Sequence, residues 1–281
     1  LVEDPQQLKP VILLDELTNR KLRRKYHVAD EYDYRENSIY KTYLACDAVS
    51  DEILLRNHYR CNKKIIDFNN KKYYNSKLQV QSDSRERQPL VYVNVDGGPG
   101  DMKNTSPAEV EEIMRYAGEN PDKSIAVITP FVNQRILIER GIKENGFEHV
   151  VCGTVHAFQG DEKDVVLFST ALSDRTGKGT YDWLKNNKEL INVATSRAKD
   201  KLILLADGKE LERLHQGNED DDLYELVQYV KTNGESKITE KHISSRALGI
   251  QPFSTETEAA FMKNLTHALE NIWLPRNKYT I

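Results

Sequence analysis

The sequence predicts a doubly wound α/β domain, built on a parallel sheet, over residues 51–207. Short and continuous apolar runs recur at 125–128, 165–168 and 202–206, as expected for strands that are buried on both faces. Segments with helical spacing separate these runs, which is typical of helices that cover a parallel sheet. Polar turns follow several of the runs, where open α/β sheets usually bind their ligands.

Residues 1–50 are expected to be a loop and a connector that come before this sheet. Leu1-Val2 resembles the end of a strand, and a polar loop bounded by Pro5 and Pro10 follows it. We therefore interpret the chain as part of a longer protein. The charged, tyrosine-rich stretch 18–43 predicts helices or a mobile connector. Its tyrosines are expected to pack on neighbouring residues in preference to stacking on bases.

The sheet domain is predicted to begin with a helix and a strand. Apolar residues have helical spacing at 65–74. Six Lys or Arg residues and one acid lie within 56–72, where they either form a solvated helix face or contact phosphates. Residues 90–95 predict a strand. The glycine-rich turn 97–100 lacks the Lys-Ser or Lys-Thr that a phosphate-binding loop requires, which favours a surface turn.

Helices and strands are then expected to alternate. Ser106 is the predicted cap of a helix that ends near Gly118, with Pro107 in its first turn and Glu109 at the capping-box position. The later predicted elements are a strand at 125–130, a helix at 133–145 closed by Gly146, strands at 150–155 and 165–172, helical structure within 182–199, and a strand at 202–206.

Residues 208–281 are predicted to be a helical C-terminal extension. The part at 208–234 has an acidic, helical pattern, and residues 254–258 show a second capping-box pattern that begins another helix. That last helix is interpreted either as an ordinary capped helix or as the start of a further domain.

Composition indicates a globular protein without a membrane segment. The 281 residues are 38% hydrophobic and 30% charged, and no apolar run has the length of a membrane span or the form of a signal peptide. We therefore expect a cytoplasmic protein. Cys46, Cys61 and Cys152 are far apart, which predicts neither a disulfide framework nor a metal site. With a net charge of −4, any nucleic-acid contact should be local.

A polar turn at 153–164 is the strongest candidate for a ligand site. It joins the predicted strand at 150–155 to the apolar run at 165–168 and contains Gln, Gly, Asp and Glu in sequence. Some thirty residues later, an amphipathic segment ends at Arg197. We expect Arg197 to lie over the same edge of the sheet as this turn, so the two segments predict a phosphate-handling site.

In this order, the motifs resemble those of superfamily 1 helicases, from the third motif to the sixth. The resemblance covers residues 1–207 and implies a RecA-like second motor domain. The Phe-Gln-Gly-x-Glu form of the fifth motif is similar to the branch that moves 5′ to 3′. The segments that carry the resemblance are Glu3-Asp4-Pro5-Gln6-Gln7-Leu8, His58-Tyr59-Arg60, Ile128-Thr129-Pro130-Phe131 with Gln134, residues 154–164, and Asn192-Val193-Ala194-Thr195-Ser196-Arg197-Ala198-Lys199.

The resemblance implies a set of residues that act on ATP. Arg60 and Arg197 would be arginine fingers, because ATP hydrolysis needs positive charge against the γ-phosphate and arginine offers a fixed fork of donors. Gln7 would contact the γ-phosphate. The remaining nucleotide contacts would be Tyr59, which would stack on the adenine, and Gly160 and Glu162, which would line the nucleotide.

A second implied set faces the nucleic acid. Thr129, Thr154 and His156 would contact phosphates or sugars of a single strand, and such contacts position a strand without reading its sequence. Simpler interpretations stay open for single residues. His156 could cap a turn, and Arg197 could be a cation that interacts with the end of a helix.

Two departures from the family pattern matter. Glu3 stands where the third motif usually has glycine. No Gly-x-x-x-x-Gly-Lys-Ser/Thr and no Asp-Glu strand end come before it, so we expect ATP and Mg²⁺ as cofactors but place the Mg²⁺ ligands outside this chain. The chain alone is then predicted not to hydrolyse ATP.

The helix that begins after 254–258 also weakly resembles the first helix of nuclease domains fused to some helicases.

The expected partners are single-stranded nucleic acid, with DNA favoured over RNA, and a first RecA-like domain of the same protein. The alternative is a non-catalytic module with a helicase-like fold that binds nucleic acid or a protein. Retention of both Arg60 and Arg197 favours the motor, because a decayed motor has no need of them.

Overall fold

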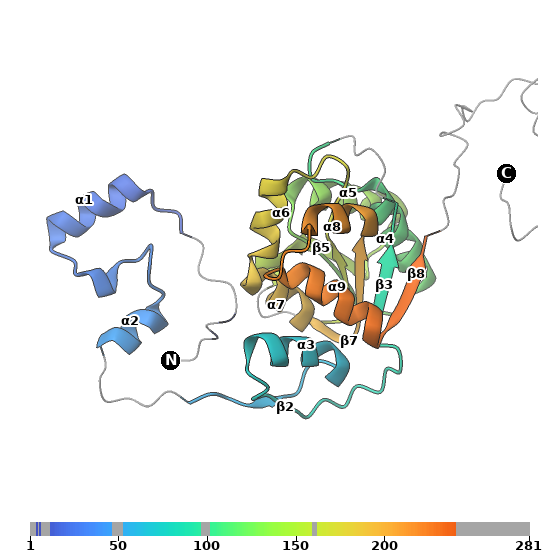
Figure 1. Ribbon diagram of the computed structural model, residues 1–281, viewed down its shortest axis with the longest axis horizontal. Helices are drawn as coiled ribbons and strands as arrows, with labels where there is room; N and C mark the ends of the chain where they lie inside the picture. Colours follow the sequence, from blue (N-terminus) through green and yellow to red (C-terminus); the bar gives the residue numbers. More distant parts are fainter. Residues whose placement is uncertain are drawn as a thin grey trace, which may run out of the picture. The chain divides into compact units, whose positions relative to one another are not determined.

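A computed structural model describes residues 4, 6, 12–46, 53–96, 102–158 and 162–239 (Figure 1). The chain divides into two compact units, Leu1–Ile238 and Thr239–Ile281. Almost all of the second unit lies outside the described residues, and so does the predicted capped helix that begins after 254–258. The predicted strand end at Leu1-Val2 also lies outside them. The fold below is that of the first unit.

Six parallel strands form the main sheet, in the order β5-β4-β6-β7-β3-β8. Chain connections leave the adjacent strands β4 and β6 in opposite directions, since β4 leads to β5 and β6 leads to β7. The sheet is therefore doubly wound, with its switch point between β4 and β6. The strands are β3 (Leu90–Asn94), β4 (Ile125–Thr129), β5 (Val150–Thr154), β6 (Lys163–Ser169), β7 (Ala198–Ala206) and β8 (Glu235–Ile238).

Helices cover both faces of this sheet, as Figure 1 shows. One face packs against α4 (Pro107–Glu119) and α5 (Val132–Asn145) through Ile113, Ala117 and Ile138. The other packs against α3 (Lys63–Tyr73), α6 (Lys178–Lys185), α7 (Lys188–Ser196), α8 (Gly208–His215) and α9 (Asp222–Asn233). The predicted doubly wound α/β class is confirmed.

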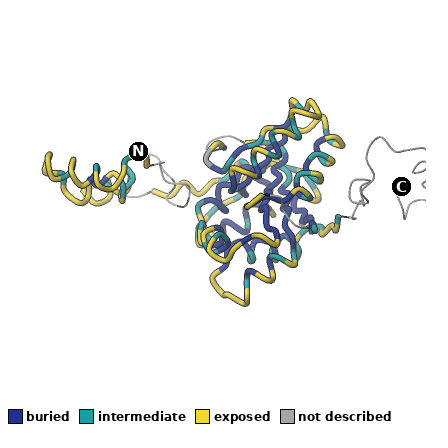
Figure 2. The backbone as a smooth tube through the Cα atoms, turned by 90° about the horizontal axis from the view of Figure 1, so that it is seen from above, coloured by how far each residue is buried: buried dark blue, intermediate teal, exposed yellow. Residues whose placement is uncertain are grey.

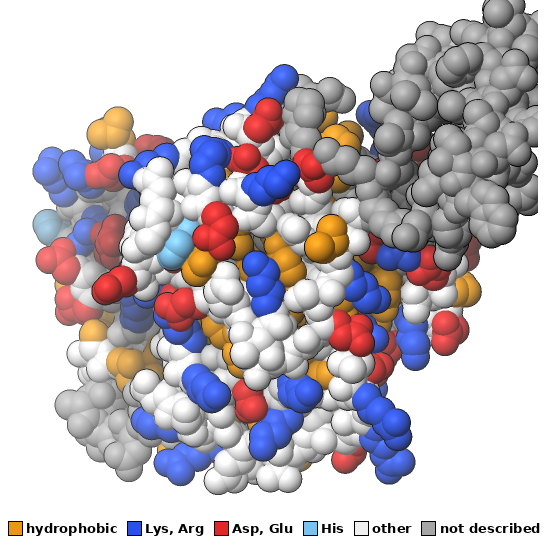
Figure 3. Space-filling model, turned by 45° about the vertical axis from the view of Figure 1, so that its right-hand side comes forward, with side chains coloured by type: hydrophobic (Ala, Val, Ile, Leu, Met, Phe, Trp, Pro, Cys, Tyr) orange, Lys and Arg blue, Asp and Glu red, His pale blue; other side chains and the backbone are white. Residues whose placement is uncertain are grey.

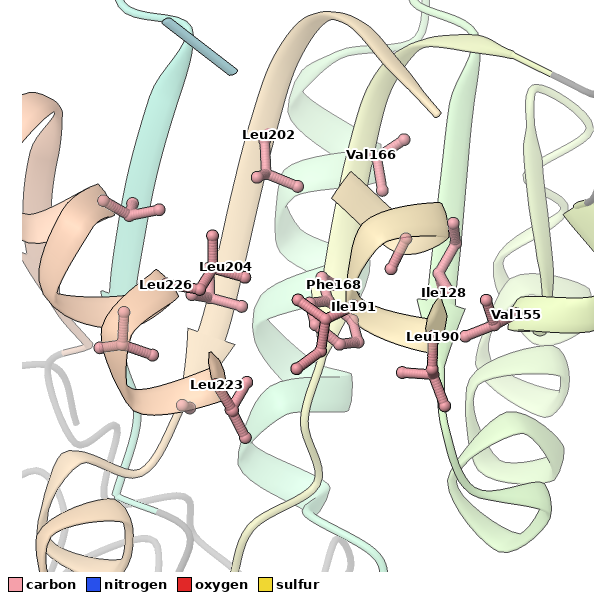
Figure 4. Close-up of a cluster of buried hydrophobic side chains, with 14 of the residues drawn as sticks. Ile128, Val155, Val166, Phe168, Leu190, Ile191, Leu202, Leu204, Leu223 and Leu226 are labelled. Atoms are coloured by element: carbon pink, nitrogen blue, oxygen red, sulfur yellow. The ribbon is translucent and has the colours of Figure 1, made fainter. Parts of the chain in front are cut away.

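Alternate strand residues supply the two cores. Phe168 and Leu204 belong to the core under α7 and α9, and Figure 4 shows Ile191 and Leu226 of these helices directed toward them. Their neighbours along the strands pack into the core under α4 and α5. Both faces are thus buried, which explains why the strands read as continuous apolar runs. Figure 2 shows the buried positions gathered in the interior of this region.

Local sequence signals set several helix ends. The Ser106 hydroxyl accepts from the backbone N–H of Glu109 at the start of α4, and Asn187 accepts from Leu190 N at the start of α7. α5 ends at Gly146, whose φ of 66° is favoured by glycine. The predicted cap at Ser106 and the predicted helix end at Gly146 are confirmed.

Residues 12–46 form α1 (Glu16–Tyr26), the 3-10 helix η1 (Asp30–Tyr32) and α2 (Ile39–Cys46). Helical structure was one of the two expectations for 18–43. Asp15 caps α1 by accepting from Thr18 N, and the buried Asn19 donates to Asp33 at 2.9 Å. Most side chains of α1 and α2 are exposed.

The sheet domain continues past the predicted boundary at 207. α8 and α9 contribute Leu211, Leu226 and Val230 to the main core, and β8 pairs with β3 as the edge strand. The structure therefore differs from the prediction of a separate C-terminal extension, because residues 208–238 complete the α/β unit. A second, small sheet pairs β1 (Asn57–His58) with β2 (Gln79–Val80).

Candidate functional site

Three of the predicted nucleotide contacts meet at the amino edge of the sheet, where β6 and β7 begin. Glu162 comes immediately before β6, and Arg197 comes immediately before β7. Arg60 approaches from the turn before α3, and its Nε donates to Glu162 Oε2 at 2.7 Å. Its Nη1 also donates to the carbonyl of Ser196 at 3.4 Å. Residues separated by more than a hundred positions in sequence thus form one group.

The two arginines of this group differ in burial. Arg197 is only 2% exposed, and its pKa is lowered by burial first and then by the neighbouring Arg60 guanidinium. Arg60 keeps 30% of its side chain exposed and Glu162 keeps 52%. The accessible Arg60 guanidinium is suited to bind an anionic ligand, because arginine offers a fixed fork of donors.

Hydrogen bonds from the start of α3 hold this arrangement in place. Cys61 Sγ donates to Ser196 O at 3.2 Å, and Asn62 N donates to Lys199 O at 2.7 Å. His58 Nε2 accepts from Cys61 N at 3.0 Å. Burial, followed by the charge of Arg60, lowers the pKa of His58 to about 4, so the ring is neutral near pH 7 and can accept. Burial raises the pKa of the Cys61 thiol to about 12.

Tyr59 lies beside these charges and is 68% exposed. Its ring is therefore accessible to a planar ligand, as stacking on a nucleobase would require. Gln7 and Gly160 lie outside the described residues. Of the six predicted nucleotide contacts, the structure thus brings together Arg60, Glu162 and Arg197, with Tyr59 next to Arg60.

The predicted nucleic-acid contacts lie at the opposite, carboxyl edge of the sheet. Thr154 is the last residue of β5 and is half-buried. Thr129 ends β4 and is fully buried, with its hydroxyl accepting from Phe131 N at 3.5 Å. His156 belongs to the 3-10 helix η2 (Val155–Phe158), and its side chain lies outside the described part of the molecule.

The expectation that Arg197 and the whole 153–164 turn share one edge is wrong. Because β5 and β6 are both parallel to β4, the connection between them must run from the carboxyl edge back to the amino edge. Thr154 is at its start and Glu162 is at its end. The turn therefore reaches both edges, and only its end lies with Arg197.

A buried polar cluster occupies the carboxyl edge at the switch point, and sequence reasoning missed its role. Glu109 is fully buried. Its carboxyl oxygens accept from Ala171 N at 3.0 Å and from the Ser169 hydroxyl at 2.5 Å. Gln134 links the same Ser169 to Ser106, through Nε2 and Oε1 respectively. Glu109 sits at the predicted capping-box position, but its carboxylate bonds to the end of β6.

Within the described ranges, no group of three or more His, Cys, Asp or Glu side chains is placed to hold a metal ion. No helix in the described part of the chain is long and apolar enough to cross a membrane. Figure 3 shows a face on which Lys and Arg side chains are interspersed with Asp and Glu side chains.

Known proteins with similar sequences include several helicases. Mouse RNA helicase Mov10l1 is 27% identical over 272 residues, covering 83% of this chain and 22% of that protein. An uncharacterised ATP-dependent helicase of Methanocaldococcus jannaschii is 28% identical, covering 67% of this chain and 31% of that protein. Human DNA replication ATP-dependent helicase/nuclease DNA2 is 26% identical, covering 73% and 22%. The chain thus spans less than a third of the length of these relatives.

Among solved structures, the C-terminal domain of a possible DNA helicase from Lactobacillus plantarum aligns with a TM-score of 0.39 and 17% identity, covering 65% of this chain and 99% of that one. A family model described as an AAA domain matches residues 35–209. That range holds α2, α3 and every strand of the main sheet except β8. Since the match covers more than half of the sequence, the chain belongs to this AAA domain family.

Proposed function

We propose that this chain is the second RecA-like domain of an ATP-dependent superfamily 1 helicase, and that it supplies Arg60 and Arg197 to ATP bound on another domain. The observation that carries the proposal is the meeting of Arg60, Glu162 and Arg197 at the amino edge, with Arg60 Nε 2.7 Å from Glu162 Oε2. The helicase names of the relatives support the same assignment.

The chemistry of the two arginines fits a role in ATP hydrolysis on a neighbouring domain. In phosphoryl transfer, charge spreads over the oxygens of the transferred group, and an added arginine stabilises that charge. Arg197 is held rigidly because it is buried at the end of α7. Arg60 is more exposed and is paired with Glu162, so it can exchange a carboxylate for a phosphate.

The other groups that ATP needs would come from a different domain. The sequence contains no phosphate-binding loop of the Walker type, so the Mg²⁺ ligands would belong to that domain. Tyr59, Gln7 and Gly160 are the further nucleotide contacts in this proposal. Tyr59 has the exposure that stacking on an adenine requires.

A single nucleic-acid strand would cross the carboxyl edge. Thr154 and His156 are the proposed contacts there, and the half-buried Thr154 ends β5 at this edge. Thr129 has no exposed surface in this conformation, so the proposal depends on the other two. Phosphate and sugar contacts do not read sequence. We favour DNA as the strand and 5′-to-3′ movement along it.

ATP hydrolysis by the full-length protein tests this function. Arg197→Ala should lower kcat by about 10³-fold or more, the usual effect of losing an arginine finger, while ATP still binds because the phosphate loop is elsewhere. Arg60→Ala should also lower kcat. Arg140→Ala is the matched control, since Arg140 is an exposed residue of α5 on the other side of the sheet.

Two results would overturn the proposal. Equal kcat values for Arg197→Ala and Arg140→Ala would remove the arginine finger. Strand binding without any ATP hydrolysis by the wild-type protein would favour a non-catalytic binding module.

A further inference from the structure

A buried hydrogen-bond network joins α3 to α7, the two helices whose ends lie next to the arginines. Asn69 of α3 and Asn192 and Thr195 of α7 are all fully buried. Asn69 Nδ2 donates to Asn192 Oδ1 at 2.7 Å and to Thr195 Oγ1 at 2.8 Å. The Thr195 hydroxyl can in turn donate to Ile191 O at 2.9 Å. These contacts fix how the two helices face each other.

The same network also reaches Gln6 and Asp4, near the start of the sequence. Asn192 Nδ2 donates to the backbone carbonyl of Gln6 at 2.8 Å and lies 3.0 Å from the Tyr74 hydroxyl. That hydroxyl donates to Asp4 Oδ2 at 2.6 Å. Tyr74 is the C-cap residue of α3. The side-chain carbonyl of Asn192 therefore accepts from Asn69 of α3, and its two amide hydrogens are directed toward Gln6 and Tyr74.

Each helix in this network adjoins one of the proposed arginine fingers. Arg197 follows the last residue of α7 directly, and Arg60 lies three positions before the first residue of α3. Since α7 has only nine residues, a shift of Asn192 relative to its partners moves the end of the helix with it. Gln6, in turn, is next in sequence to Gln7, the proposed γ-phosphate contact.

We propose that Asn192 and Tyr74 are positioning residues that set the place of Arg197 relative to the chain at Gln6. The inference rests on the proposed role of Arg197 and adds the residues through which that role is controlled. They hold α7 in register with Gln6, so that the Arg197 guanidinium keeps one position toward the phosphate.

Simple packing does not require this arrangement. An apolar pair would join α3 to α7 at similar stability, because buried polar pairs give little net stabilisation over well-packed apolar ones. A fully satisfied amide instead selects one geometry, since any other leaves buried donors without acceptors. The direction of both Asn192 hydrogens toward Gln6 and Tyr74 accounts for a polar residue at this buried position.

Removal of one hydroxyl tests the proposal in the full-length protein. Tyr74→Phe keeps the ring but deletes the hydroxyl that joins Asn192 to Asp4. Tyr73→Phe is the matched control, because it deletes the hydroxyl of the adjacent residue, which bonds to the buried Asp222 at 3.0 Å on the side of α9. Both variants lose one tyrosine hydroxyl from the same end of α3. Melting temperatures of both variants should be compared first.

The expected result separates positioning from stability. Tyr74→Phe should lower kcat for ATP roughly fivefold, the usual effect of one hydrogen bond, and Tyr73→Phe less than about twofold. In an Arg197→Ala background, measured in single turnovers, Tyr74→Phe should have no further effect, because no guanidinium remains to be positioned.

Different outcomes identify which proposal fails. If Arg197→Ala alone leaves kcat unchanged, the proposed function fails. If Arg197→Ala lowers kcat but Tyr74→Phe matches Tyr73→Phe, Tyr74 does not position Arg197. An equal effect of Tyr74→Phe with and without Arg197 would likewise overturn the positioning role.

Discussion

The two edges of the sheet differ in how deeply their polar groups are buried. At the carboxyl edge, the polar cluster of Ser106, Glu109, Gln134 and Ser169 is buried, and its members bond to one another. At the amino edge, Arg60 and Glu162 stay partly exposed, and the pKa of the buried Arg197 is lowered by burial and by Arg60. The carboxyl-edge cluster is buried, whereas Arg60 and Glu162 at the amino edge remain accessible to a ligand.

This difference bears on where a ligand can bind. Doubly wound sheets usually bind ligands at the carboxyl edge, at the switch point between strands. Here Glu109 and Gln134 fill that position, so the protein's own side chains occupy the usual ligand site. The amino edge is therefore the better place for an anion from another domain. Substitutions in the Glu109 cluster should mainly change stability, and those of the two arginines at the amino edge should mainly change activity.

The largest expected effect on stability comes from Glu109→Ala. The Ala171 N–H and the Ser169 hydroxyl would lose their acceptor, and each buried unsatisfied group costs about 1–3 kcal/mol. We expect the free energy of unfolding in urea to fall by about 3 kcal/mol or more. Glu111→Ala, at an exposed position of the same helix, should change it by less than about 0.5 kcal/mol. Equal losses would show that the cluster is not a stabilising unit.

Glu109 should also make stability depend on pH. Burial raises its pKa from 4.5 to about 8, against the opposing hydrogen bonds from Ser169, Ala171 and Thr170. Between these values the folded state holds a proton that the unfolded state releases. Stability from this group is thus complete below about pH 4.5 and is lost as pH rises toward 8, with a slope of up to about 1.4 kcal/mol per pH unit.

Urea unfolding at pH 5 and pH 8 measures this dependence. The side chain in Glu109→Gln does not titrate, so the free energy of unfolding of this variant should increase relative to that of the wild type as pH rises. Parallel curves for the two proteins would mean that Glu109 keeps one protonation state over this range.

A smaller effect is expected on strand binding at the carboxyl edge. Thr154→Ala in the full-length protein should weaken single-strand affinity by roughly fivefold, as for one lost hydrogen bond. Thr129→Val keeps the shape of a residue that is fully buried and should leave affinity unchanged. Fluorescence anisotropy with a labelled oligonucleotide distinguishes them. Weaker binding by Thr129→Val alone would reverse the assignment of the two threonines.

The smallest expected change is in stability at the amino edge. Glu162→Gln removes the partner of Arg60 in a partly exposed ion pair, and such pairs contribute at most about 1 kcal/mol. Its free energy of unfolding should therefore match that of Glu139→Gln, which breaks another partly exposed pair, with Arg135 on α5. A loss as large as that of Glu109→Ala would remove the proposed contrast between the edges.

The sequence predicted much of the fold because its strands and helix ends carry strong local signals. β4 and β7 are buried on both faces and therefore read as apolar runs. β8 was missed because it is short, mostly exposed and polar, and it joins the sheet only by pairing with β3. The boundary at 207 was misplaced for the same reason, since nothing local shows that α9 packs on β3.

The sequence did not show at which edge of the sheet each predicted site residue lies. The family motifs selected Arg60, Glu162 and Arg197, which do lie together, but motif order does not say which edge of the sheet each residue occupies. Glu109 was interpreted from its spacing to Ser106 as a capping residue. Its carboxylate instead meets Ala171, 62 positions away, and no local pattern encodes such a contact.

The connection from β5 to β6 begins in a tightly packed turn. Register places Thr154 level with Thr129, and Val165 level with Ile125, so the connection starts at the carboxyl edge and ends at the amino edge. Four of its residues form η2, which advances only about 2 Å per residue. A Cβ on Gly153 would lie 2.9 Å from the Phe158 ring, so only glycine lets η2 pack this closely. Any side chain at position 153 would therefore displace the start of the connection, next to the proposed strand contact Thr154.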